Sequence, residues 1–94
     1  MEFEWDEEKN QINISKHSFN FKDAWEIFES DVLTVLDDRE DYGEDRWIGI
    51  GVFRGRRILA VVFTERGDDL VHIISVRKAT KEEREYYEKE IFGN

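Results

Sequence analysis

The sequence contains no cysteine and no proline. Without cysteine, the chain of 94 residues can form no disulfide, no thiolate nucleophile and no cysteine metal site. Long apolar runs are also missing, since the longest, residues 58–63, falls far short of the roughly 18 residues of a membrane span. The opening MEFEWD shows neither the basic nor the apolar block of a signal peptide. We therefore expect a cytoplasmic protein that does not cross a membrane.

The composition predicts one folded domain that covers residues 1–94. Hydrophobic and charged residues each make up 39% of the chain, which is too apolar for a disordered tail and polar enough for a well-solvated surface. The 3 Trp, 7 Phe and 3 Tyr supply enough large side chains for one core. No repeat, low-complexity stretch or linker divides the sequence.

Charge is distributed unevenly along the chain. The net charge of −9 argues against simple nucleic-acid binding. Residues 46–78, however, contain 7 basic and only 3 acidic side chains, whereas residues 1–45 contain 4 basic and 15 acidic ones. A basic segment inside an acidic protein either coats a surface or attracts an anion, and charge alone does not decide between the two.

Local patterns predict a short strand and two helices in the first third of the chain. Residues 3–5 alternate like a strand, and Asp6 can cap a helix that runs to about His17. A shorter helix is expected over residues 21–28, where apolar side chains recur at steps of three and four residues and share one face. These side chains are Phe21, Ala24, Trp25 and Phe28.

Four strands and one capped helix are predicted for the rest. The strands are expected at residues 32–36, 46–53, 57–65 and 70–78. Arg54-Gly55-Arg56 forms a hairpin turn between the second and the third of these. Thr80-x-x-Glu83 is a capping box, which begins a helix that ends near Gly93. The order β-α-α-β-β-β-β-α predicts an α+β fold with an antiparallel sheet and with helices that cover one of its faces.

Several short motifs, spread over nearly the whole chain, are specific in their combined order and spacing. They are Phe3-x-Trp5-Asp6, Lys9-x-x-x-Asn13-x-x-Lys16-His17, Phe21-x-x-Ala24-x-x-x-Phe28, Gly43-Glu44-x-Arg46-Trp47-x-x-Ile50-Gly51, Val62-Phe63-Thr64-Glu65-Arg66, Ile73-Ile74-Ser75-Val76-Arg77-Lys78-Ala79-Thr80 and Glu83-Arg84-x-x-Tyr87. Together they resemble the BrnT family of ribonuclease toxins. Two positions depart from the family pattern, because Ser18 stands where a glycine is usual and His72 where an arginine is common.

The resemblance implies a fold, an activity and a partner. The fold would be RelE-like, with a mostly antiparallel sheet of four to five strands, two N-terminal helices and one C-terminal helix. The activity would be metal-independent and cofactor-free cleavage of RNA, which inhibits translation. The partner would be a BrnA-type ribbon-helix-helix antitoxin, and the toxin would meet DNA only indirectly, through the antitoxin complex.

Metal-free RNA cleavage sets three chemical requirements. The 2′-hydroxyl must lose its proton, the phosphorane must be stabilised, and the charge on the leaving 5′-oxygen must be offset. Arginine suits the phosphorane because its charged fork matches phosphate oxygens, and histidine suits proton transfer near neutral pH. The residues proposed for catalysis are Arg77, Arg66, Arg46, His17 and Tyr87, and the residues proposed to bind RNA are Lys16 and Lys78.

Each candidate also has a purely structural interpretation. Arg66 and Arg77 rest on the resemblance, because simple antiparallel pairing does not place them side by side, and either would otherwise form a surface salt bridge with Glu44 or Glu83. Pairing does bring Arg46 near Arg66, although Arg46 could simply neutralise the acidic loop before it.

The alternatives for the other two candidates are equally structural. Instead of acting in catalysis, His17 could serve with Lys16 as a cap of its helix, and Tyr87 could serve as a core residue. For the whole chain, the alternative function is a non-catalytic module that docks a basic protein partner through its acidic surface.

Overall fold

The structure, a computed structural model, describes residues 1–93 and follows the predicted order of elements. Its strands are β1 (Glu2–Trp5), β2 (Leu33–Leu36), β3 (Trp47–Phe53), β4 (Arg57–Glu65) and β5 (Leu70–Lys78). Its helices are α1 (Glu7–His17), the 3-10 helix η1 (Phe21–Asp23), α2 (Trp25–Phe28) and α3 (Lys81–Phe92). No helix within residues 1–93 is long and apolar enough to span a membrane.

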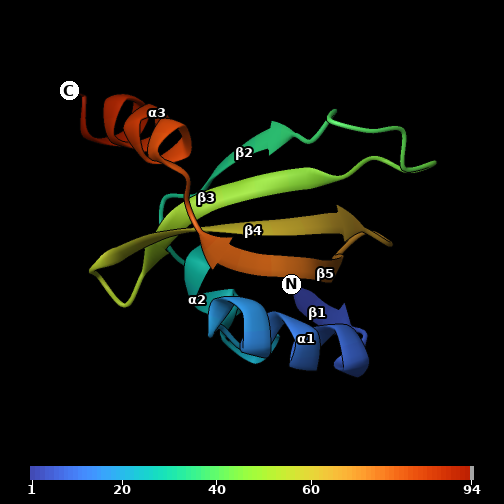
Figure 1. Cartoon of the computed structure of the whole chain (residues 1–94). Coiled ribbons are helices and arrows are strands. Elements are labelled where there is room, and N and C mark those ends of the chain that lie inside the picture. Colours follow the sequence, from blue (N-terminus) through green and yellow to red (C-terminus); the bar gives the residue numbers. More distant parts are fainter. Residues whose placement is uncertain (94) are drawn as a thin grey trace.

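All five strands form one sheet, in the order β1-β5-β4-β3-β2 (Figure 1). The pairs β2–β3, β3–β4 and β4–β5 are antiparallel, and only β1 runs parallel to its neighbour β5. The prediction of an α+β fold with a mostly antiparallel sheet of four to five strands is therefore confirmed.

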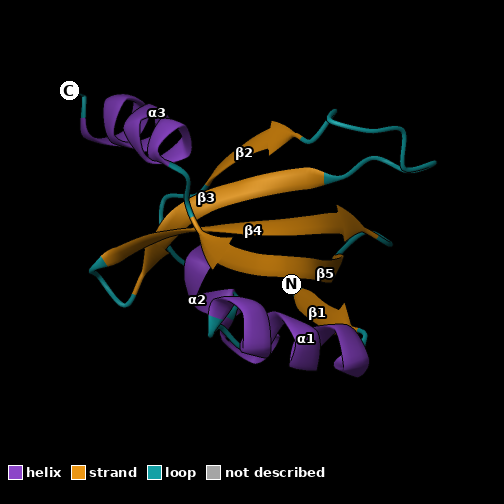
Figure 2. Cartoon of the chain, in the orientation of Figure 1, coloured by secondary structure: helices purple, strands orange, loops and turns teal. Residues whose placement is uncertain are grey.

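Apolar residues cover both faces of the sheet, so the prediction that the helices share one face is wrong. Six successive residues of β4, from Leu59 to Thr64, are buried, and a strand buried on both sides needs cover on both sides. The N-terminal helices lie over one face, and α3 lies over the other (Figure 2). Tyr87 of α3 packs with Ile48, Ile50, Ala60 and Val62, whereas Phe21 and Ile27 belong to the opposite cluster.

The second predicted helix is divided in two. Asn20 accepts a hydrogen bond from the Lys22 N–H and so caps a single 3-10 turn, after which α2 adds only four residues. The break rotates α2, so Trp25 is 50% exposed and Ile27, with 0% exposed, takes the core position instead. The predicted face was therefore wrong for Trp25, because the spacing rule assumes one continuous helix.

The two ends of α1 are set by local chemistry. Asp6 accepts hydrogen bonds from the backbone N–H groups of Glu8 and Lys9 at 2.9 and 3.3 Å, as its sequence position predicts. At the other end Ser18 has φ 68°, a left-handed conformation that glycine adopts most easily. A glycine, which the resemblance led us to expect at this position, would adopt this conformation with less strain.

Asn13 fastens α1 to the free edge of β5. Strand β1 pairs with β5 only as far as Ile73, so beyond that residue β5 has a partner strand, β4, on one side only. On the open side, the side-chain amide of Asn13 makes the hydrogen bonds that a further strand would make. Its Nδ2 donates to the Val76 carbonyl at 2.9 Å, and its Oδ1 accepts from the Val76 N–H at 3.2 Å. Nδ2 also donates to the Phe19 carbonyl at 2.9 Å. The end of α1 is thereby held beside the end of β5.

Candidate functional site

Basic side chains gather at the end of the sheet where β4 begins and β5 ends. The register places Arg77 opposite Ala60 and Lys78 opposite Leu59, only a few residues from the hairpin that joins β3 to β4. The last turn of α1, which carries Lys16 and His17, lies along the same end (Figure 1). Two elements distant in sequence, α1 and β5, thus contribute basic side chains to one region.

Arg77 is held by α3. Its Nη1 and Nη2 donate to the two carboxylate oxygens of Glu83 at 2.7 and 3.0 Å, and Nη1 also donates to the Lys78 carbonyl at 3.2 Å. Glu83 is itself fixed by the capping box, in which it accepts from the Thr80 N–H at 2.8 Å. Burial alone would raise the pKa of Glu83, but the hydrogen bonds from Arg77 and Thr80 outweigh it and lower the pKa. The predicted capping box is confirmed, and the ion pair with Glu83 is the structural role that the sequence left open.

His17 lies half-buried above a shallow groove between α1 and β5. The groove has a volume of about 210 Å³ and is also lined by Lys16, Ile74 and Ser75. Burial lowers the pKa of His17, and the positive charges of Lys16 and Arg77 lower it further. At neutral pH the imidazole is therefore mostly uncharged, which is the form that accepts a proton.

Arg66 and Arg46 lie at the opposite end of the sheet from Arg77. Arg66 comes six residues after Ala60, the β4 residue that pairs with Arg77, so the backbones of the two arginines are roughly 20 Å apart. The two arginines therefore do not contact the same phosphate, as the predicted pairing indicated. Glu44 lies 3.8 Å from both Arg46 and Arg66, so these two arginines do meet, with a carboxylate between them.

Tyr87 has the surroundings of a core residue. Its side chain is 1% exposed and packs edge to face on Phe92, with ring centroids 5.8 Å apart. Burial raises the pKa of its hydroxyl. A group so enclosed does not contact a polymer at the surface unless α3 moves.

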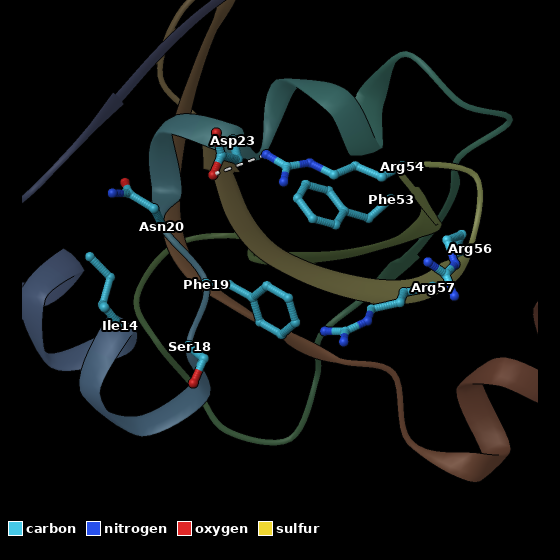
Figure 3. Close-up of a pocket in the computed structure, with 9 residues that line it drawn as sticks. All are labelled: Ile14, Ser18, Phe19, Asn20, Asp23, Phe53, Arg54, Arg56 and Arg57. Carbon is cyan, nitrogen blue, oxygen red and sulfur yellow. Dashed lines mark ion pairs between the residues drawn. The ribbon is translucent and has the colours of Figure 1, made fainter.

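The sequence did not predict a hollow that the structure shows next to the β3–β4 hairpin. It has a volume of about 620 Å³ and lies beneath the β3–β4 hairpin, between η1 and the end of α1 (Figure 3). Arg54, Arg56 and Arg57 surround it, and Phe19 and Phe53 line it. The signal was present as three arginines within four residues, but that stretch was interpreted only as a turn. Within residues 1–93, no cluster of three or more His, Cys, Asp or Glu side chains is arranged to hold a metal ion.

Comparisons with known proteins show which family the chain is similar to. A family model described as "Ribonuclease toxin, BrnT, of type II toxin-antitoxin system" matches residues 5–83. The crystal structure of the Brucella abortus ribonuclease toxin BrnT is similar, with 36% sequence identity and a TM-score of 0.67. The match covers 86% of this chain and 99% of that chain. A search of curated proteins found no significant match.

Proposed function

Because the chain belongs to the BrnT family of ribonuclease toxins of type II toxin–antitoxin systems, we propose that it is a metal-independent endoribonuclease that cleaves RNA and so inhibits translation. The observation that carries the proposal is that the positive charge of Arg77, a permanently charged fork on β5, acts on His17 of the adjoining helix α1 and helps to lower the pKa of its imidazole. These groups offer an anion-stabilising donor and a proton acceptor on neighbouring elements at the edge of the sheet.

The proposed reaction is an internal transfer at the scissile phosphate. His17 takes the proton of the 2′-hydroxyl, the 2′-oxygen forms a bond to phosphorus, and the bond from phosphorus to the 5′-oxygen breaks. The leaving oxygen takes a proton from the protonated imidazole or from water, and a 2′,3′-cyclic phosphate remains. Lys16 and Lys78 hold neighbouring phosphates in this arrangement, because both lie beside the proposed centre.

Arg77 keeps donors free for the phosphate. A guanidinium has five N–H groups, and three hydrogen bonds to Glu83 and to the Lys78 carbonyl use only three of them. The remaining two can bind a phosphorane oxygen while Glu83 holds the side chain still. Arg46 and Arg66, at the far end of the sheet, would instead contact phosphates away from the scissile bond, and buried Tyr87 would support α3 rather than the reaction.

The proposed partner is a BrnA-type ribbon-helix-helix antitoxin, through which the complex meets DNA. The family's place in type II systems supports an antitoxin, and the acidic first half of the chain supports a basic docking surface on it.

The test is cleavage of RNA by the purified chain with excess EDTA, together with induced expression in cells with and without the antitoxin. We expect RNA cleavage in EDTA, growth arrest by the chain alone and growth when both proteins are present. A folded chain that binds a basic partner but leaves RNA intact would support the non-catalytic docking module instead.

His17 should shape the pH dependence of cleavage. Since its pKa is lowered from the ordinary 6.5, the acid limb of kcat/KM is expected to have an apparent pKa below that value. Activity is present above this pKa, where the imidazole is neutral, and is lost as pH falls through it. The pH profile of kcat/KM measures the limb, and His17→Gln should remove it. An unchanged limb in a folded His17→Gln protein would exclude His17 as the base.

A further inference from the structure

We propose that the hollow beneath the β3–β4 hairpin is a second subsite, which binds the phosphate backbone of single-stranded RNA beside the cleaved bond. This inference rests on the proposed ribonuclease function and extends it to a region that the reaction itself does not use. We call the hollow, with Arg54, Arg56, Arg57, Phe19 and Phe53, the hairpin subsite.

The shape of the hairpin subsite suits a nucleotide strand. The hollow, of about 620 Å³, is open to the surface, and Figure 3 shows Arg54 and Arg57 extending along it from the hairpin, with Arg56 beside the turn. Phe19 and Phe53 meet edge to face at its base, with ring centroids 6.0 Å apart. Arg57 lies above the Phe19 ring, 6.0 Å from its centroid. Arginines beside aromatic rings are a common arrangement in proteins that bind single strands.

The charge of the hairpin subsite is only partly neutralised. Arg54 approaches Asp23 and Glu26 at 3.8 and 3.5 Å, which is looser than the 2.7 Å contact of Arg77 with Glu83. Within the described residues, the guanidinium groups of Arg56 and Arg57 form no ion pair and no hydrogen bond with protein groups. In a chain with a net charge of −9, two neighbouring arginines without a carboxylate partner mark an anion-binding place.

The backbone of the hairpin gives a second argument. Arg54 has φ 54° and Gly55 has φ 69°, so the turn places two successive residues in the left-handed region. Glycine and asparagine adopt this conformation with the least strain, yet an arginine occupies the first position. A charged residue in a strained conformation at the rim of a hollow indicates a function for the side chain.

The subsite adjoins the proposed reaction centre. Arg57 begins β4, and Ala60, three residues later, pairs with Arg77 on β5. Three strand residues span about 10 Å, which brings Arg57 and Arg77 within reach of one RNA strand. Arg57 shares the face of the sheet that carries Phe19, whereas Arg77 contacts α3 on the other face, so an RNA strand that binds both would cross the end of the sheet into the hollow. Arg46 and Arg66 lie at the other end of the sheet.

The test uses binding without cleavage and compares two pairs of substitutions. In an Arg77→Ala background, the affinity for a single-stranded RNA oligonucleotide is measured over a range of salt concentrations. The double variant Arg56→Ala, Arg57→Ala should lose affinity less steeply with salt. The magnitude of the slope of log affinity against log salt concentration should fall by about 1.4, because each lost phosphate contact removes about 0.7. The matched control is Lys81→Ala with Arg84→Ala on exposed α3, which removes the same charge and should leave the slope unchanged.

Steady-state kinetics in the otherwise unaltered protein give a second readout. The hairpin pair should raise KM several-fold and leave kcat unchanged, because these arginines bind substrate away from the reacting atoms. Arg54→Gly should also weaken RNA binding without lowering the thermal midpoint, since glycine relieves the turn.

The outcomes separate the subsite from the ribonuclease function. If the parent protein cleaves RNA, and the hairpin double variant has the same salt slope and the same KM as the control double variant, then the subsite proposal is overturned and the ribonuclease proposal stands. A parent that binds RNA through the hairpin arginines but does not cleave it would support the subsite and overturn the function. If the hairpin double variant binds RNA as the parent does but loses affinity for the antitoxin, then the hollow binds an acidic protein segment and the inference is overturned.

Discussion

Arg77→Ala is expected to slow RNA cleavage by about a hundred- to a thousand-fold, which corresponds to about 2.7–4 kcal/mol of lost transition-state stabilisation. Arg77 lies between a paired strand and a capped helix, and Glu83 fixes its guanidinium, so its two free N–H donors need no reorganisation when charge develops on the phosphorane. Single-turnover cleavage of an RNA oligonucleotide measures the effect on the chemical step.

Two further variants separate catalysis from support of the fold. Arg77→Lys keeps the charge but loses the fork, so activity should still fall clearly. Glu83→Gln keeps an oxygen for the Thr80 N–H and removes the charge opposite Arg77, so it loosens α3 without removing the proposed donor. If Arg77 only anchors α3, then Glu83→Gln and Arg77→Ala should lower the thermal midpoint and the activity together. Parental cleavage by a folded Arg77→Ala protein would contradict the catalytic assignment.

Asn13→Ala is expected to lower the free energy of unfolding by about 3 kcal/mol. The substitution leaves the Val76 N–H, the Val76 carbonyl and the Phe19 carbonyl without their partner inside the protein, and each buried unpaired group costs about 1–3 kcal/mol. For a domain of this size, the thermal midpoint should fall by roughly 12–24 °C. Thermal and urea unfolding followed by circular dichroism measure both quantities.

The controls for Asn13 are on the same helix. Gln11→Ala removes an exposed amide that bonds only Glu7, so stability should hardly change. Asn13→Asp keeps the acceptor for the Val76 N–H but cannot donate to the two carbonyls, and a large loss should remain. If Asn13→Ala unfolds at the same midpoint as Gln11→Ala, then the amide does not hold α1 on β5.

Local patterns predicted the elements whose causes are local. Thr80 and Glu83 satisfy each other's backbone, so the start of α3 follows from four residues of sequence. Strand β4 also has its predicted bounds, because turns flank a continuous apolar run. By contrast, the break after Asp23 and the placement of α3 on the second face depend on contacts between distant segments, which periodicity within one helix does not contain.

In the candidate site, too, the sequence predicted local features but not those that depend on contacts between distant segments. The family motifs made His17 and Arg77 candidates, and the structure places the elements that carry them, α1 and β5, in contact. Asn13, which links those elements, belonged to one of the family motifs, but its role was not evident from the sequence because its partners lie 6 and 63 residues away. The hairpin arginines were visible as a basic run, yet only the fold places Phe19 and the end of α1 against them.

The pairing of the first strand with the last has a consequence for biosynthesis. Strand β1 lies beside residues that the ribosome adds nearly 70 positions later, and the Asn13 contact joins residues 63 positions apart. A growing polypeptide can therefore form the β2–β3 and β3–β4 pairs early, but it can add β1 to the sheet and pack α1 against β5 only after β5 has been synthesised. The elements that carry His17 and Arg77 come together only at that stage, so the proposed reaction centre cannot form on a nascent chain that still lacks β5.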